Sequence, residues 1–197
     1  VALNSLQVVN TLLDRYFIGH LSEDTIAAHG GATSIMFLMF SLAVALATGA
    51  TAIVSRAFGA QDEAEVREAA DQSTKLALAV GLVIGAGSFL LAPYAARAIL
   101  PASAPVAIRE MAAFCAIYSL GLPATFAIQC LAGSLRGIGD TKSPMVISGI
   151  QIGIHILLNF VFITRLGWGL SGAAAALAIS GWMSALGYLA YVHRTPL

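Results

Sequence analysis

The sequence predicts an all-α, polytopic membrane protein in which six transmembrane helices form a single bundle over residues 1–197. Apolar residues make up 58% of the chain, and charged residues only 10%, against about 25% in soluble domains. The mean hydropathy is +0.85. Apolar runs of about 20 residues, long enough to cross a bilayer, recur along the whole chain. The six predicted spans lie at about 1–19, 32–55, 72–96, 107–135, 144–164 and 170–192.

Turn-forming and charged residues separate these spans. The breaks lie at 20–31, 56–71, 101–105, 137–143 and 165–169. Pro144 suits the first turn of the fifth span, with Ser143 as its cap. Asp62 and Glu65 have the spacing of a capping box, so the charged segment 61–75 is interpreted as a helical extension outside the membrane.

Two further pairs of residues constrain the helices. Asp71 and Lys75 are spaced for an ion pair along one helix face. Cys115 and Cys130 both fall within the predicted fourth helix. At 1.5 Å per residue they would lie about 22 Å apart, too far for a disulfide bond. The cysteines are therefore expected to be small buried residues.

The distribution of positive charge predicts how the bundle is oriented. An even number of spans places both ends of the chain on the same side of the membrane. That side would hold Arg56, Arg67, Lys75, Arg136, Lys142 and Arg194, whereas the other would hold Arg15, Arg97, Arg109 and Arg165. Positive residues favour the cytoplasmic side. We therefore expect both termini in the cytoplasm of a plasma or inner membrane.

The first span carries a polar stripe that ends in an acid. Asn4, Gln7, Asn10, Thr11 and Asp14 fall within about a third of the helix circumference at about 100° per residue. A carboxylate inside a membrane span is costly and marks a functional site by default. The stripe predicts a helix that lines a path for a cation or a proton.

The fifth span repeats this pattern. Ser148, Gln151, His155 and Asn159 fall within about 80° of arc at helical spacing. Lipid cannot form hydrogen bonds with these groups, so the stripe is expected to face protein or a water-filled cavity. If His155 lies near Asp14, the two would titrate as a coupled pair. Sodium would prefer oxygen ligands, which Asp14, Asn10 and Asn159 could supply, so His155 favours a proton.

Polar or small residues also line up on three other spans. On the fourth span Tyr118, Thr125 and Gln129 share one face, which could line a substrate cavity or pack against protein. On the second span, Ser34, Ser41, Thr48 and Ser55 recur at sevens, and on the sixth, Gly172, Ala176, Ser180 and Ser184 recur at fours. Small residues let membrane helices approach closely, and hydroxyls can bond back to their own helix. Both of these stripes are interpreted as packing surfaces.

Several classes of function find no support in the sequence. Ten basic residues balance ten acidic ones, and no basic patch suggests nucleic acid. The glycine-rich run 133–143 lacks P-loop spacing and lies between two membrane helices rather than after a strand. No His/Cys cluster has zinc spacing, and no nucleophile–base motif is visible. We therefore expect neither an enzyme nor a cofactor beyond a coupling ion.

Three sequence blocks carry a recognisable pattern: Leu13-Asp-Arg-Tyr-Phe-Ile-Gly-His-Leu21, Val54-Ser-Arg-Ala-Phe-Gly-Ala-Gln-Asp62 and Leu135-Arg-Gly-Ile-Gly-Asp-Thr-Lys-Ser-Pro-Met145, with Gly172-Ala173-Ala174 in support. Together they resemble blocks of the multidrug and toxic compound extrusion (MATE) family of cation-coupled antiporters. The loop residues in these blocks are Gly59, Arg136, Gly137, Gly139, Asp140 and Pro144. The three blocks occur in the family's order and span nearly the whole chain.

The resemblance implies one lobe of a larger transporter. Family members have twelve helices in two six-helix lobes, and this chain is similar to the amino-terminal lobe. The partners implied are the lipid bilayer, amphipathic or cationic substrates, and a second six-helix lobe or a second copy of the chain. By position, the family's cation or proton site would use Asp14 and Asn159, with a possible Na⁺ between them and His155 one turn earlier. Members often carry Asn at His155, and a hydroxyl residue sometimes found in the sixth helix is here Leu177.

Two other functions stay open at this point. A lipid or lipid-linked oligosaccharide flippase of related architecture would need a cationic cavity for phosphate head groups, but no Lys or Arg lies deep in a predicted span. The chain could instead be a non-transporting scaffold or an inactive fragment, because one lobe alone cannot form a cleft between lobes. Because Val1 already lies inside an apolar stretch, we expect a truncated or processed start.

Overall fold

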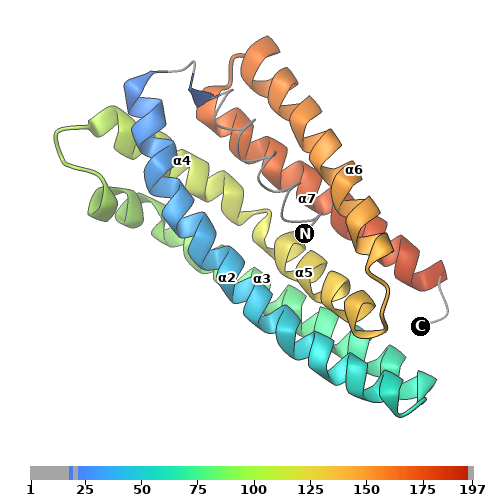
Figure 1. Ribbon diagram of the computed structural model, residues 1–197. Helices are drawn as coiled ribbons and strands as arrows, with labels where there is room; N and C mark the ends of the chain where they lie inside the picture. Colours follow the sequence, from blue (N-terminus) through green and yellow to red (C-terminus); the bar gives the residue numbers. More distant parts are fainter. Residues whose placement is uncertain (1–17, 20–21, 195–197) are drawn as a thin grey trace.

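The computed structural model describes residues 18–19 and 22–194, and the regular structure in this part of the chain is helical throughout (Figure 1). The elements are α2 (Glu23–Gly59), α3 (Glu63–Ile99), α4 (Pro105–Ser119), α5 (Leu122–Gly137), α6 (Lys142–Asn159), the π-helix η1 (Phe160–Arg165) and α7 (Gly169–Arg194). The predicted first span, 1–19, lies almost entirely outside the described residues.

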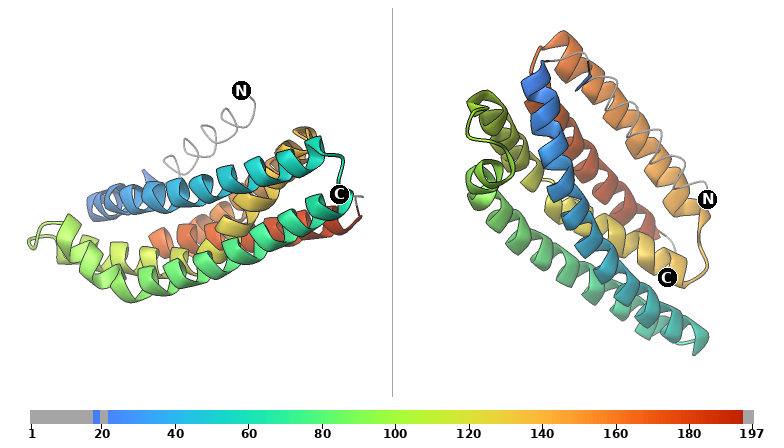
Figure 2. Two further views of the ribbon diagram at one scale, coloured as in Figure 1. Left: turned by 90° about the horizontal axis from the view of Figure 1, so that it is seen from below. Right: turned by 60° about the vertical axis from the view of Figure 1, so that its left-hand side comes forward.

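The described helices are long and apolar enough to cross a membrane. α2, α3, α6 with η1, and α7 each meet that condition, and the bent pair α4 with α5 would add a fifth span if it crosses the membrane as one. The predicted class, an all-α polytopic membrane protein, is confirmed. Figure 2 shows that the helices run roughly along one common direction and form an elongated bundle.

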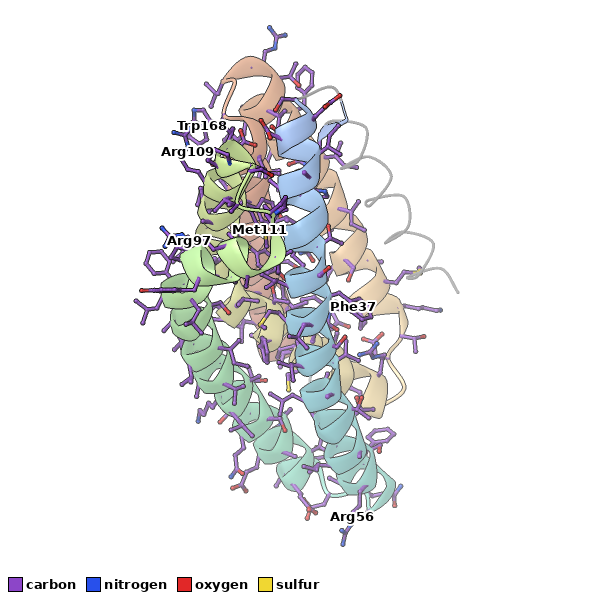
Figure 3. All side chains as sticks on the ribbon, turned by 90° about the vertical axis from the view of Figure 1, so that its left-hand side faces the viewer. Phe37, Arg56, Arg97, Arg109, Met111 and Trp168 are labelled. Carbon is purple, nitrogen blue, oxygen red and sulfur yellow. The ribbon has the colours of Figure 1, made fainter. Side chains whose placement is uncertain are left out.

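The bundle has two ends, which we name after a residue at each. The Gly59 end carries the turn at 60–62, the loop at 138–141 and the end of α7, and the Pro101 end carries the loops at 100–104 and 166–168 (Figure 1). In Figure 3, Arg56 lies at the Gly59 end, and Arg109 and Trp168 lie toward the opposite end.

α2 begins nine residues before the predicted second span, so most of the predicted break at 20–31 is helical. Ser22 caps the helix, because its side chain accepts a hydrogen bond of 3.3 Å from the backbone N–H of Thr25. Glu23 and Asp24 lie in the first turn, where negative charge interacts favourably with the helix dipole. Local capping therefore extends the helix beyond the apolar stretch.

The charged segment after α2 is helical, as predicted. Only 60–62 separate α2 from α3. Asp62 caps α3, because Oδ1 accepts a 2.9 Å hydrogen bond from the backbone N–H of Glu65, and Lys75 pairs with Asp71 at 2.6 Å. α2 and α3 each contain 37 residues and are therefore about 55 Å long.

The fourth span is broken, contrary to the predicted continuous helix at 107–135. α4 and α5 meet at an angle of 49°. Pro123, in the first turn of α5, has no N–H to donate to the preceding turn and disfavours helical backbone before it. The indole Nε1–H of Trp182 donates to the carbonyl of Leu120 at the break, at 3.0 Å. The two cysteines consequently lie on different helices, and both are buried and free.

Glycines on α3 allow close packing against this break. A Cβ atom on Gly81 would lie 2.7 Å from Pro123 Cα, and one on Gly85 would lie 2.9 Å from the Ser119 carbonyl oxygen. Both distances are shorter than any normal contact, so the helix backbones meet without intervening side chains. The corner between α4 and α5 is therefore fixed by the surface of α3.

α6 begins two residues before the predicted fifth span, and its cap differs from the prediction. Asp140, not Ser143, satisfies the first backbone donors, because its Oδ1 accepts from the N–H groups of Lys142 at 3.1 Å and Ser143 at 3.0 Å. Gly139 precedes it with φ of +85°, a conformation that glycine adopts without strain. The predicted Ser143 cap fails because the short loop brings the Asp140 carboxylate to the helix end first.

α5 is the central helix and packs on α2, α3 and α7, whereas α6 packs mainly on α7 and has little contact with α5. Buried apolar clusters fill the bundle in three zones. Met111 and Phe114 belong to the cluster toward the Pro101 end, Leu122 and Phe126 to a middle cluster, and Tyr188 to the cluster toward the Gly59 end. The weak α5–α6 contact leaves space beside α6 in the middle of the bundle.

The two small-residue stripes differ in their surroundings. Hydroxyls on α2 bond back to the helix, as predicted: Ser41 to Phe37 at 2.8 Å, Thr48 to Val44 at 2.9 Å and Ser55 to Ala52 at 3.1 Å. With Ser34, these residues are exposed. The predicted ladder on α7, formed by Gly172, Ala176, Ser180 and Ser184, is buried, as expected for close packing.

Candidate functional site

A cavity of about 380 Å³ lies beside α6 in the middle of the bundle. It is partly open, and its described lining comes from four places: α2, the α4–α5 corner, α6 and α7. Its described lining consists of Thr33, Met36, Phe37, Phe40, Tyr118, Gly121, Thr125, Ile128, Gln129, Ser148, Gln151, Ile152, His155, Leu177, Ala178, Ser180 and Gly181. Figure 3 shows Phe37 on α2 between Arg56 and Arg109, about midway along the bundle. The volume is within the usual range for small-molecule sites.

The polar stripe predicted for the fifth span forms the α6 wall. Ser148, Gln151 and His155 all line the cavity, because residues three and four apart share a helix face. His155 is only 3% exposed, and its Nε2 lies 3.2 Å from Nδ2 of Asn159. With the amide in this orientation, Nδ2 is the donor and Nε2 the acceptor. Asn159, 1% exposed, supports His155 from one turn further along.

The polar face predicted for the fourth span forms the facing wall. Tyr118, Thr125 and Gln129 line the same cavity as Gln151 and His155, although the chain bends between the first two of these residues. The structure therefore brings together two polar groups that the sequence could place only on separate helices. Their role in substrate binding remains a prediction.

Sequence reasoning missed the other two walls. The α2 wall consists of Thr33, Met36, Phe37 and Phe40, and the α7 wall of Leu177, Ala178, Ser180 and Gly181. A search for polar stripes does not select these mostly apolar residues, which look like any lipid-facing or packing surface. The serines and threonine of the predicted α2 stripe do not line the cavity. The available signal for the α2 wall was the spacing of Thr33 and Phe40, which lie seven residues apart on one helix face.

The first-helix part of the predicted coupling site lies outside the described residues. Asp14, Asn10 and Gln7 belong to it, so their approach to His155 and Asn159 stays a prediction, as does a Na⁺ ion held by Asp14 and Asn159. Within the described ranges, no group of three or more His, Cys, Asp or Glu residues could hold a metal ion.

The loop-motif residues gather at the Gly59 end rather than at the cavity. Gly59 ends α2, and Arg136 is exposed in the last turn of α5. Gly137 packs on α2, where an added Cβ would lie 3.0 Å from the Thr51 carbonyl oxygen. Pro144 is buried, and its carbonyl accepts a 3.0 Å hydrogen bond from the hydroxyl of Tyr188. With the Gly139 turn and the Asp140 cap, these residues shape the connection from α5 to α6.

The cavity has an amphipathic wall without formal charge. Among the lining residues that the structure describes, none is Asp, Glu, Lys or Arg. Aromatic and sulfur-containing side chains of α2 face amides, hydroxyls and an imidazole from α5 and α6. A helical membrane lobe built around such a cavity is the class of structure from which secondary transporters are assembled.

Comparison with known proteins identifies the family. The MatE family model matches residues 1–161, and the chain belongs to this family, whose members are transporters rather than enzymes. The chain is 29% identical to a probable multidrug resistance protein NorM of Thermotoga maritima, over 96% of this chain and 41% of that protein. It is 30% identical to a probable NorM of Deinococcus radiodurans, over 93% and 40%. The chain thus spans about two fifths of the length of these curated relatives.

Solved structures show the same fold. An outward-facing multidrug resistance MATE family transporter matches all of this chain with a TM-score of 0.93 at 24% identity, over 44% of its own length. A MATE structure in complex with Br-NRF matches 98% of the chain with a TM-score of 0.86. The described bundle therefore has the fold of slightly less than half of a MATE transporter.

Proposed function

We propose that this chain is the amino-terminal six-helix lobe of a secondary active antiporter that exports amphipathic or cationic organic molecules in exchange for H⁺ or Na⁺. The observation that carries the proposal is the amphipathic cavity beside α6. Membership of the MatE family supports it, as do relatives described as multidrug resistance proteins.

The cavity walls suit amphipathic substrates. Met36, Phe37 and Phe40 offer an adaptable apolar surface, because methionine is flexible and aromatic rings can stack on flat ligands. Aromatic faces also attract organic cations. Gln129 and Gln151 provide both donors and acceptors on the opposite side. These groups can bind varied molecules without requiring one fixed pattern of charges.

Coupling would depend on Asp14 together with the α6 pair His155 and Asn159. Protonation or cation binding at Asp14 neutralises the charge of its carboxylate. This event shifts the conformational equilibrium by the difference between its binding free energies in the two states. We favour protons as the coupling ion. Sodium would use only the oxygen ligands of Asp14 and Asn159, so the imidazole of His155 beside them favours a proton.

A second six-helix lobe is the proposed partner, and α2 offers a surface for it. Exposed and mostly small residues recur at alternating steps of three and four along one face: Ser34, Leu38, Ser41, Ala45, Thr48, Ala52, Ser55 and Gly59. We call this face the α2 seam. Small residues allow close approach of membrane helices. Because the chain covers only two fifths of its relatives, we assign the seam to the lobe that completes the transporter.

We place the protein in the plasma or inner membrane with its Gly59 end in the cytoplasm. That end carries Arg56, Arg67, Arg136 and Lys142, against Arg97, Arg109 and Arg165 at the Pro101 end. The excess favours this orientation. A flippase for phosphate-bearing lipids is less well supported, because the described cavity lining includes no Lys or Arg.

Transport driven by defined gradients tests the proposal. Vesicles that contain the chain together with the carboxy-terminal half of the Thermotoga maritima relative as the second lobe are loaded with a fluorescent cationic dye. Efflux is then compared under a pH gradient and under a sodium gradient. We expect efflux with the pH gradient and its loss in Asp14→Asn. Asp71→Asn, which removes an exposed carboxylate, should transport like the parent. Transport by Asp14→Asn at the parent rate would refute the coupling site, and no gradient-driven efflux would favour a non-transporting scaffold.

A further inference from the structure

Two tyrosines of α7 form hydrogen bonds with the beginning of α6 and the loop before it. The hydroxyl of Tyr188 donates to the carbonyl of Pro144 at 3.0 Å and lies 3.3 Å from Oγ of Ser148. One turn further on, Tyr191 donates to Oδ2 of Asp140 at 3.1 Å and accepts from Ser143 at 2.7 Å. We call this set of bonds the tyrosine clamp. These bonds join α6 and the loop before it to α7 at the Gly59 end.

Tyr188 lies between the cavity and the Gly59 end of the bundle. Its side chain is fully buried, at 0% exposed, within an apolar cluster that also contains Val54 of α2, Val66 of α3 and Leu135 of α5. The cluster meets the cavity directly, because Ile128 belongs to both. Ser148, which bonds to Tyr188, lines the cavity as well. Tyr188 is not itself a lining residue, but it lies directly behind Ser148 and Ile128 on that side of the cavity.

The clamp matters because, among the described helices, α6 is held mainly by α7. α6 packs mainly on α7 and has little contact with α5, and the cavity occupies the space beside it. Movement of the α6 start away from α7 would remove Pro144 and Ser148 from the Tyr188 hydroxyl. The same movement would shift Gln151 and His155, which follow on the same helix face. Closure of the cavity and the position of its polar wall therefore depend on the same bonds.

We propose that Tyr188 is a positioning residue that seals the cavity toward the Gly59 end and holds the polar face of α6 in place, so that access from that side requires its bonds to α6 to break. The seal is a property of the lobe itself. Its use in alternating access rests on the proposed transport function.

Cysteine accessibility tests the seal without any transport measurement. Ile152 lines the cavity, so Ile152→Cys reports entry of a charged, membrane-impermeant methanethiosulfonate reagent. Single-cysteine reporters at Gln61, in the turn of the Gly59 end, and at Ser103, in a loop of the Pro101 end, show which side the reagent reaches in sealed vesicles. Both native cysteines are buried, so labelling is read relative to the chain without the Ile152 change.

Loss of the Tyr188 hydroxyl should open the cavity toward the Gly59 end. In vesicles whose Gln61 reporter reacts, we expect Ile152→Cys to react slowly and Tyr188→Phe to raise its rate roughly fivefold or more, as expected for the loss of one or two hydrogen bonds. Tyr94→Phe, on the exposed side of α3 at 67% exposure, serves as the matched control and should change nothing.

The alternatives give distinct results. An unchanged labelling rate in Tyr188→Phe, or fast labelling already in the parent, would overturn the seal. If Tyr188→Phe raises the labelling rate of Ile152→Cys equally in vesicles whose Ser103 reporter reacts, the seal is also overturned. General loosening of the bundle would let the reagent enter from both ends. Since labelling needs no dye efflux, a chain that fails the transport test can still pass this one.

Discussion

Asp140 illustrates how one side chain organises a loop. Partial burial alone would raise the pKa of its carboxyl group, but hydrogen bonds from Ser143, from Tyr191 and from the backbone N–H of Lys142 lower it below its usual range. These donors favour the ionised form. The charged carboxylate is therefore part of the folded structure at neutral pH.

This lowered pKa predicts how stability depends on pH. A carboxyl group with a lower pKa in the folded state stabilises the fold above its unfolded pKa of about 3.9, and the contribution is lost as pH falls toward the folded pKa. We expect Asp140→Asn to be less stable than the parent at pH 7, with a difference that shrinks as the pH falls below the unfolded pKa of about 3.9. Thermal unfolding of purified protein in detergent measures it. A difference that does not change with pH would contradict the assignment.

Individual site residues were predictable where they were polar and regularly spaced. Periodicity placed Gln151 and His155 on one face of a helix, and the same face lines the cavity. Met36 and Phe40 could not be found this way, because an apolar side chain in an apolar helix carries no signal of what it faces. The orientation of an apolar wall is decided by packing between helices that are distant in sequence.

At the scale of elements, the α4–α5 corner depends on close backbone contact with α3. An alanine at position 81 would place its Cβ 2.7 Å from Pro123 Cα, so the two helices must separate. We expect Gly81→Ala to destabilise the protein by about 1–3 kcal/mol, the usual cost of overpacking. The melting temperature of the purified protein should fall accordingly.

Gly87→Ala on the same helix is the matched control. A Cβ there meets nothing within 4 Å, and alanine is a better helix former than glycine by about 0.5–1 kcal/mol. The control should be as stable as the parent or slightly more so. Equal destabilisation by both substitutions would show that the effect is not due to the corner.

Element types were easier to predict than their limits. Long apolar runs identify the spans, because the requirement to cross a bilayer is strong. The early start of α2 depends on a single cap at Ser22, outside the apolar run. The break before Pro123 was missed because proline is also tolerated in bent membrane helices, so the sequence alone does not fix whether a span continues through it.

For the whole molecule, the α2 seam predicts association with a second lobe. A tryptophan at Thr48, midway along the seam, would keep two helices from close approach. We expect Thr48→Trp to reduce capture of the carboxy-terminal half of the Thermotoga maritima relative, supplied in the same membrane, by roughly tenfold, the effect of about 1.4 kcal/mol. Leu82→Trp on α3, where Leu82 is 59% exposed, should leave capture unchanged. Self-association of the chain that is lost in Thr48→Trp would assign the seam to a second copy.

The π-helix η1 has a consequence for how the length of this chain can vary. A residue inserted into an α-helix rotates everything beyond it by about 100° and advances it by 1.5 Å. An insertion between Ser148 and His155 would therefore turn the imidazole out of the cavity. A wider turn accommodates one extra residue locally. Because η1 follows Asn159 directly, deletion of one residue within Phe160–Arg165 can be absorbed by a return to α-helical geometry. We therefore expect the loss of one residue to be tolerated just after the polar face of α6 and not within it.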